Sequence, residues 1–279
     1  MTERTEIDFL FGSDSDKDKI MPGLVRLKEE GLIQPIVHFI SADNNSETDV
    51  ALVIKRVKDR GREHEVYIGG AGLCNQLAGT LRKKARLQDL PIAVPISDST
   101  MKGVSSFLSS SEKPPMSPLP TVGLDNTYAA GNIAYRFLRQ PFRGVHVVRR
   151  VNSEEESRKI YDQLKKLGIH PSDAANIHPD EVVINPFSSI DQISEIDEIL
   201  RKGTGVQIAV VTQGGVDIDT YMRALNGTEV TALVNNVKSY ANSVYVAAIV
   251  IQDKGALAKL AQEREAKAAH LRNLERIVV

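Results

Sequence analysis

Tryptophan is absent from this chain, cysteine occurs once, and aromatic residues make up only 5% of its 279 residues. The single cysteine, Cys74, cannot form an intrachain disulfide, which fits a reducing compartment. The formal net charge is -1, so the composition gives no sign of a surface for nucleic acid or for a membrane. No apolar run is long enough to span a bilayer, and residues 1–6 lack the apolar core of a signal peptide. These absences predict a cytoplasmic globular protein that binds neither nucleic acid nor membranes.

What the chain does have is a regular alternation of short apolar runs with segments of helical periodicity. Hydrophobic residues make up 42% and charged residues 25%, which is ordinary for a globular protein with a sizeable core. In the first half we expect strands at residues 7–11, 35–40, 66–69, 91–96 and 120–124, and helices at residues 15–30, 48–60, 75–85 and 127–139. Such alternation predicts an α/β fold with a doubly wound parallel sheet of the flavodoxin-like kind.

Small and polar residues follow several of the expected strands. They form the turns Gly12-Ser13-Asp14-Ser15-Asp16, Ser41-Ala42-Asp43-Asn44, Gly70-Ala71-Gly72-Leu73-Cys74-Asn75 and Ser97-Asp98-Ser99. Ligands of parallel α/β sheets bind at the carboxyl ends of the strands, where small residues let the backbone come close and helix N-termini attract anions. We therefore expect these turns to form one composite ligand site.

Each turn also has a simpler explanation. Glycine serves tight turns in many α/β proteins, and Asp14 or Ser15 would cap the helix at residues 15–30. Cys74 could act as a nucleophile, but the favoured interpretation is that it serves as a small packed side chain. Residues 105–118, rich in serine and proline, form either a mobile cover over the site or a plain linker.

Taken together, the turns resemble the motifs of a known enzyme family. Gly12-Ser13-Asp14-Ser15-Asp16 resembles the Gly-Ser-x-Ser-Asp start of the PurE family, the carboxylases and mutases of aminoimidazole ribonucleotide (AIR) in purine biosynthesis. Ser41-Ala42 matches the start of that family's Ser-Ala-His motif, and residues 71–79 resemble the Ala-Gly-x-x-Asn-x-Leu-x-Gly turn of its class II branch. Class I members carry a histidine where this chain has Gln76, so the class II match is closer. The resemblance covers the first half of the chain.

The resemblance implies a lyase that interconverts AIR plus carbon dioxide with carboxyaminoimidazole ribonucleotide (CAIR), without a metal or an organic cofactor. Asp43 stands where the family has the histidine that moves the proton, so Asp43 and the neighbouring Ser41 are the candidate catalytic residues. An ordinary aspartate is a poor acid at neutral pH, and burial or a neighbouring carboxylate would have to raise its pKa. The implied substrate-binding residues are Gly12, Ser13, Asp14, Ser15, Asp16, Asn44, Gly70, Ala71, Gly72, Asn75, Ser97, Asp98 and Ser99.

The missing histidine leaves three functions open. The first is the lyase with Asp43 as its acid and base, which is favoured because Ser13, Asp16, Ser41 and Asn75 are retained together. The second is a regulatory or ligand-binding relative that kept the nucleotide site without the reaction. The third is a carboxylase that acts on a different nucleotide. Among the six histidines, His38 lies in the strand that leads to Asp43, where core packing is its expected role.

The second half repeats the pattern of the first. We expect strands at residues 144–148, 182–184, 206–211, 230–234 and 244–251, and helices at residues 153–167, 190–201, 217–225 and 256–276. This order predicts two similar domains, residues 1–140 and 141–279, from an internal duplication, or else an unrelated α/β domain. Gln213-Gly214-Gly215 falls opposite residues 70–72, whereas Arg149-Arg150-Val151-Asn152-Ser153 replaces the first polar turn. The second copy would then have lost most of its site.

Oligomerisation is expected from the same resemblance. PurE proteins are typically octamers of single-domain chains, so a fused chain is predicted to form a homo-oligomer of four chains. The second copy would then complete a site across an interface, with Arg149 or Arg150 as a phosphate contact.

Overall fold

The computed structural model describes residues 5–29, 33–40, 46–72, 75–99, 102–113, 117–139, 141–172, 174–211, 222, 225, 230–233 and 239–275. Its first sheet consists of β1 (Thr5–Phe11), β2 (Ile33–Phe39), β3 (Val66–Ala71) and β4 (Leu90–Pro95), all parallel, in the order β2-β1-β3-β4. Thr121 pairs with Ala93 in a parallel bridge beside β4. If the segment at Thr121 is counted as the fifth strand of this sheet in chain order, the strand order is 2-1-3-4-5, which is the flavodoxin-like order. The predicted parallel α/β fold is confirmed.

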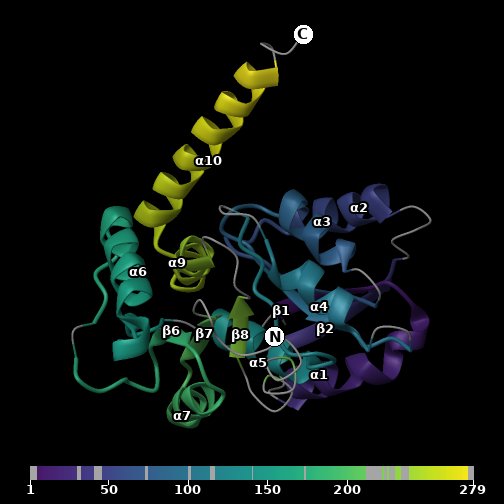
Figure 1. The fold of residues 1–279 in the computed structure, drawn as a ribbon. Helices are drawn as coiled ribbons and strands as arrows, with labels where there is room; N and C mark the ends of the chain where they lie inside the picture. Colours follow the sequence, from purple (N-terminus) through teal and green to yellow (C-terminus); the bar gives the residue numbers. More distant parts are fainter. Residues whose placement is uncertain are drawn as a thin grey trace.

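Helices cover both faces of this sheet (Figure 1). They are α1 (Lys17–Glu29), α2 (Ser46–Asp59), α3 (Gln76–Lys84), α4 (Val104–Ser111) and α5 (Thr127–Leu138). Side chains of a strand point alternately to opposite faces. Phe9 and Phe11 of β1 accordingly belong to the core with residues of α1 and α5, whereas Leu10 belongs to the core with residues of α2 and α3.

Residues 105–118 are only partly a connection, because α4 occupies the first part of this segment. Phe107 is fully buried, and the hydroxyls of Ser110 and Ser111 donate to carbonyl oxygens one turn earlier in the helix. Serine is a poor helix former by itself, so the burial of Phe107 decides the local structure. The alternative of a plain linker is therefore wrong for residues 105–111, whereas the alternative of a mobile cover over the site stays a prediction.

The second sheet lies beside the first and is also fully parallel (Figure 1). Its strands β5 (Val145–Val147), β6 (Val182–Phe187), β7 (Val206–Val211) and β8 (Val230–Leu233) follow one another in sequence order. Its helices are α6 (Glu154–Leu167), α7 (Asp191–Leu200), α9 (Ser239–Val250) and α10 (Lys254–Glu275). α10 extends away from the body of the molecule in Figure 1. Among the residues that the structure describes, no helix is both long and apolar enough to cross a bilayer.

The predicted strand at residues 244–251 is wrong, because α9 occupies this segment. Residues of α9 from Val244 to Val250 are buried, and the helix packs against β6, β7, α6 and α10. A helix that is covered on every side is apolar on every side. Periodicity does not distinguish such a run from a buried strand, which explains the error.

The two sheets share one strand order. Ser172 pairs with His146 in a parallel bridge beside β5. If β5, the segment at Ser172, β6, β7 and β8 are numbered 1 to 5 in chain order, the second sheet also has the order 2-1-3-4-5. In both halves the first strand leads through a single 3-10 turn, η1 (Asp14–Asp16) or η2 (Val151–Ser153), into a helix. This likeness supports the duplication, which stays a prediction. The boundary between residues 140 and 141 also stays a prediction, since one hydrophobic cluster contains residues of both sheets.

The shared order corrects the expected equivalence of the turns. β6 is the neighbour of β5 as β3 is of β1, and by strand register residues 186–188 correspond to residues 70–72. Gln213-Gly214-Gly215 follows β7, the partner of β4 in this comparison, and therefore corresponds to Ser97-Asp98-Ser99. The predicted pairing of residues 213–215 with residues 70–72 is thus wrong by one strand.

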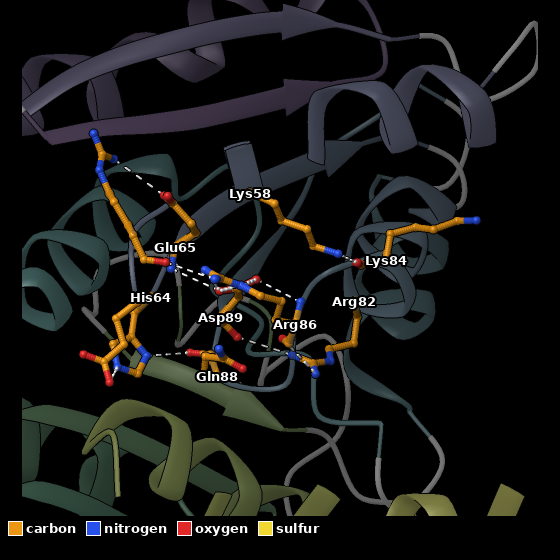
Figure 2. Close-up of polar contacts among 10 residues, drawn as sticks. Lys58, His64, Glu65, Arg82, Lys84, Arg86, Gln88 and Asp89 are labelled. Atoms are coloured by element: carbon orange, nitrogen blue, oxygen red, sulfur yellow. Dashed lines mark hydrogen bonds and ion pairs between the residues drawn. The ribbon is translucent and has the colours of Figure 1, made fainter. Parts of the chain in front are cut away.

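A buried polar cluster lies at the amino ends of β3 and β4 (Figure 2). Asp89 is fully buried, and its carboxylate accepts hydrogen bonds from the Arg86 guanidinium at 2.8 Å and from the Glu65 amide at 3.1 Å. Glu65 is 2% exposed, and its carboxylate lies 3.6 Å from the Arg62 guanidinium. Burial raises the pKa of Glu65 to about 7 against the opposing pull of Arg62 and Arg60. Its Oε1 atom has no hydrogen-bond partner among the described residues.

Candidate functional site

The carboxyl ends of β1, β3 and β4 meet at one edge of the first sheet. The Gly12 amide donates to the Gly70 carbonyl oxygen at 3.1 Å, and a Cβ atom on Gly12 would lie only 3.2 Å from Ala71 Cβ. A Cβ atom on Gly72 would be in ordinary van der Waals contact with Asp98 Cβ at 3.8 Å, so the turns after β3 and β4 also touch. The structure thus brings the turns after these three strands together, with Gly72 beside Asp98.

The turn after β1 is stabilised by its own hydroxyls. Ser13 caps η1: its Oγ accepts hydrogen bonds from the Ser15 amide at 3.2 Å and from the Ser15 hydroxyl at 2.8 Å. The predicted caps, Asp14 and Ser15, are exposed instead. Asp16 is 8% exposed, and burial raises its pKa while the nearby Lys19 opposes the shift. Capping accounts for one Oγ atom in this turn and leaves the buried Asp16 unexplained.

Two residues that the sequence did not indicate hold the turn after β4. The Lys19 ammonium donates to the Ser97 carbonyl oxygen at 2.6 Å and to Ser97 Oγ at 2.9 Å. Asp125 Oδ1 accepts from the Ser97 amide at 2.9 Å and lies 3.5 Å from Lys19 Nζ. Asp98 Oδ2 accepts from the Gly103 amide at 3.2 Å, and Ser99 is exposed. Lys19 and Asp125 therefore fix the position of Ser97, one from α1 and the other from the turn before α5.

Asn75 has a structural role. It is fully buried, its Oδ1 atom accepts from the Ala78 amide at 3.3 Å, and it caps α3. Its Nδ2 atom donates to the Val94 carbonyl oxygen at 3.3 Å and to Ser110 Oγ at 3.0 Å, which ties α3 to β4 and α4. A contact between Asn75 and the substrate stays a prediction.

Replacing Asn75 with alanine is expected to lower the free energy of unfolding by about 2 kcal/mol, because a cap and the buried partners of Nδ2 are lost together. Urea unfolding followed by circular dichroism measures this change. Replacing Asn176, an exposed asparagine, with alanine is the control. An Asn75→Ala protein as stable as the wild type would contradict the structural role.

The predicted catalytic residues Ser41 and Asp43 lie outside the described residues, as do Asn44 and Cys74. The Ile40 amide donates to the Phe11 carbonyl oxygen at 2.7 Å, so the chain reaches residue 40 beside the end of β1. The catalytic role of Asp43 stays a prediction.

His38 has an ionic partner and does not serve apolar packing alone. Its Nε2 atom lies 2.8 Å from Asp8 Oδ1, and Arg60 Nη1 lies 2.7 Å from Asp8 Oδ2. Burial would raise the pKa of Asp8, but the hydrogen bonds from His38 and Arg60 outweigh it and lower that pKa. Asp8 pairs with Ile36 and Tyr67 within the strands, so this ionic group lies in the sheet and away from its carboxyl edge.

A doubly wound sheet with polar turns gathered at its carboxyl edge defines an α/β protein of the class that binds ligands at this edge. Within that class, the chain belongs to the AIR carboxylase family, whose model matches residues 6–159 and so includes the whole site described above. Residues 160–279 lie outside the matched range.

Three similar proteins illustrate the match. The N5-carboxyaminoimidazole ribonucleotide mutase of Pyrococcus horikoshii is 31% identical over 167 residues, which cover 60% of this chain and 90% of that protein. The chloroplastic phosphoribosylaminoimidazole carboxylase of Vigna aconitifolia is 33% identical over 135 residues, 48% of this chain and 23% of that protein. The crystal structure of Treponema denticola PurE aligns with a TM-score of 0.40 at 20% identity and covers 59% of this chain and 94% of that one.

Proposed function

We propose that the chain is an enzyme of purine biosynthesis, of the carboxylase and mutase class, and that it interconverts AIR plus carbon dioxide with CAIR. The observation that supports this most is the meeting of the turns at Gly12, residues 70–72 and Asp98 in a chain of the AIR carboxylase family. A ribonucleotide monophosphate would lie across these turns, and no metal or organic cofactor is expected.

The residue types at this edge suit a sugar phosphate. Both acceptor positions of Ser13 Oγ are taken by Ser15, so the Ser13 hydroxyl keeps its proton to donate to a phosphate oxygen. Asp16 is suited to accept hydrogen bonds from ribose hydroxyls, as acidic residues do in nucleotide-binding folds.

The reaction requires a change in one carbon–carbon bond and the transfer of one proton. Carboxylation forms one bond between C4 of the imidazole and the carbon of carbon dioxide, and the proton on C4 must leave to a base. Decarboxylation breaks the same bond, and an acid must return the proton. Positioning and proton transfer are therefore the main tasks, and Asp43 would carry the proton in both directions.

The replacement of the family histidine by Asp43 favours one alternative: a regulatory relative that binds the nucleotide without turnover. A carboxylase for another nucleotide is a weaker option. The predicted association of four chains also stays a prediction.

An assay with CAIR separates these functions. The wild-type chain is expected to decarboxylate CAIR to AIR, and calorimetric titration is expected to show one AIR site per chain. A parallel reaction with N5-carboxyaminoimidazole ribonucleotide distinguishes a mutase from a carboxylase. Binding of AIR without any turnover would support the regulatory function, and binding of no nucleotide would remove the proposal.

Replacing Ser13 with alanine is expected to weaken AIR binding by about tenfold, because one hydrogen bond to a charged phosphate is lost. Titration of AIR and of aminoimidazole riboside, which lacks the phosphate, checks the cause. The variant should bind the riboside as the wild type does. Equal losses for both ligands would show that Ser13 acts only as the cap of η1.

A further inference from the structure

Buried side chains pack at the carboxyl edge of the second sheet, at the end of β6. Phe187, the last residue of β6, is fully buried and corresponds by strand register to Ala71, the last residue of β3. Phe187 belongs to a hydrophobic cluster with Val211 of β7, Leu225, and Phe107 of α4. The second edge is therefore packed against the first half of the chain, in the place where a ligand would lie in a working copy.

Arg150 closes the polar part of the same edge. Its place as the residue before η2 corresponds to that of Ser13 before η1. The Arg150 guanidinium donates to Asn185 Oδ1 at 2.6 Å and to the Pro186 carbonyl oxygen at 3.2 Å, both at the end of β6. The Arg149 guanidinium lies over the Tyr161 ring at 4.6 Å from its centre. Arg149 and Arg150 thus both contact residues of the second half of the same chain.

The second half instead contacts the turn at residues 123–126. A Cβ atom on Gly123 would lie 2.5 Å from the Leu225 carbonyl oxygen, so only glycine permits this approach. Asn126 Nδ2 donates to the same carbonyl oxygen at 3.0 Å. Leu124 packs against the hydrophobic cluster that contains Leu225 and Phe187. The position of the turn therefore depends on Leu225.

The same turn carries the group that fixes Ser97. Asp125 has a φ of 56°, a left-handed conformation that a residue other than glycine keeps only where its surroundings enforce it. Its amide donates to the Pro95 carbonyl oxygen at 2.8 Å, and its Oδ1 atom accepts from the Ser97 amide at 2.9 Å. A continuous path of contacts thus runs from Leu225 through Gly123 and Asp125 to Ser97.

We propose that the second half is a positioning element for the site in the first half, and that Leu225 acts through the turn at residues 123–126 to hold Asp125 and Ser97 in place. The inference rests on the proposed function for its effect on substrate, although the contact itself does not. The second half would then have lost its own ligand site, and its surface would support the site in the first half.

The test compares two Leu→Ala variants in the second half. Leu225→Ala keeps the carbonyl oxygen to which Asn126 donates but removes the side chain whose cluster packs against Leu124. Leu200→Ala removes a side chain that is 1% exposed and clusters with Val148, Val183 and Ile196 of the second half. Both are expected to lower the melting temperature. Only Leu225→Ala should raise the KM for CAIR, by about tenfold. Equal effects of the two variants on KM, or none from Leu225→Ala, would overturn the inference.

Hydrogen exchange separates this inference from the proposed function. In Leu225→Ala the Ser97 and Asp125 amides, whose bonds depend on the turn, are expected to exchange at least tenfold faster than in Leu200→Ala. Gly123→Ala, which places a Cβ atom against the Leu225 carbonyl group, should give the same result. Unchanged exchange in both variants would refute the positioning role. A wild-type chain without turnover of CAIR would refute only the proposed function.

Discussion

Asp43→Asn is expected to lower the rate of CAIR decarboxylation by about 10²- to 10⁴-fold and to leave CAIR binding nearly unchanged. Asparagine has the shape of aspartate but is neither an acid nor a base in this pH range, and the loss of a general acid or base costs a factor of this size. Rates at saturating CAIR, with calorimetric titration of the same variant, separate chemistry from binding. Asp59→Asn makes the same change at an exposed residue at the end of α2 and serves as the control.

The pH profile adds a second check on Asp43. As the acid in decarboxylation, Asp43 must be protonated, so the rate should fall as the pH rises through its pKa. The variant should lack this dependence. A burial effect like the one that raises the pKa of Asp16 would extend activity toward neutral pH. Wild-type rates in Asp43→Asn would show that another group moves the proton, and the catalytic role of Asp43 would be wrong.

The sequence predicted the first sheet well because its signals are local. Each strand is a short apolar run that ends at small or polar residues, and the helices between them have clear apolar stripes. Parallel pairing and right-handed connections then leave few arrangements open. The meeting of the turns at one edge follows from that topology, as Gly12, Gly70 and Asp98 show.

The sequence could not predict features that depend on distant partners. Lys19 and Ser97 are 78 positions apart, and no local pattern indicates that one binds the other. Asp125 gains its role from a backbone conformation that Leu225 and Pro95 support across the fold. α9 is helical because it is covered on all sides, which its uniform apolar sequence does not reveal. In each case tertiary packing decided between local alternatives.

Glu65 makes the stability of the fold depend on pH at the edge opposite to the site. Its pKa is about 7 in the folded chain against 4.5 for the ordinary side chain, so the folded state binds more protons between these values. The free energy of unfolding therefore falls as the pH rises from about 4.5 to above 7. A shift of this size corresponds to about 3 kcal/mol when Glu65 is fully ionised. Because Glu65 is 2% exposed, solvent screens little of this cost.

Glu65→Gln is accordingly expected to be more stable than the wild type at pH 9 by up to about 3 kcal/mol, with the advantage shrinking toward pH 5. The difference between variant and wild type is the quantity to measure, by urea unfolding, because it removes the contribution of other titrating groups. His146 is one such group, since burial lowers its pKa and gives the opposite dependence on pH. Glu63→Gln, at a residue whose side chain is 61% exposed, is the matched control and should show little change. A difference between Glu65→Gln and wild type that is the same at pH 5 and pH 9 would mean that Glu65 is ionised at both, held by Arg62 despite its burial.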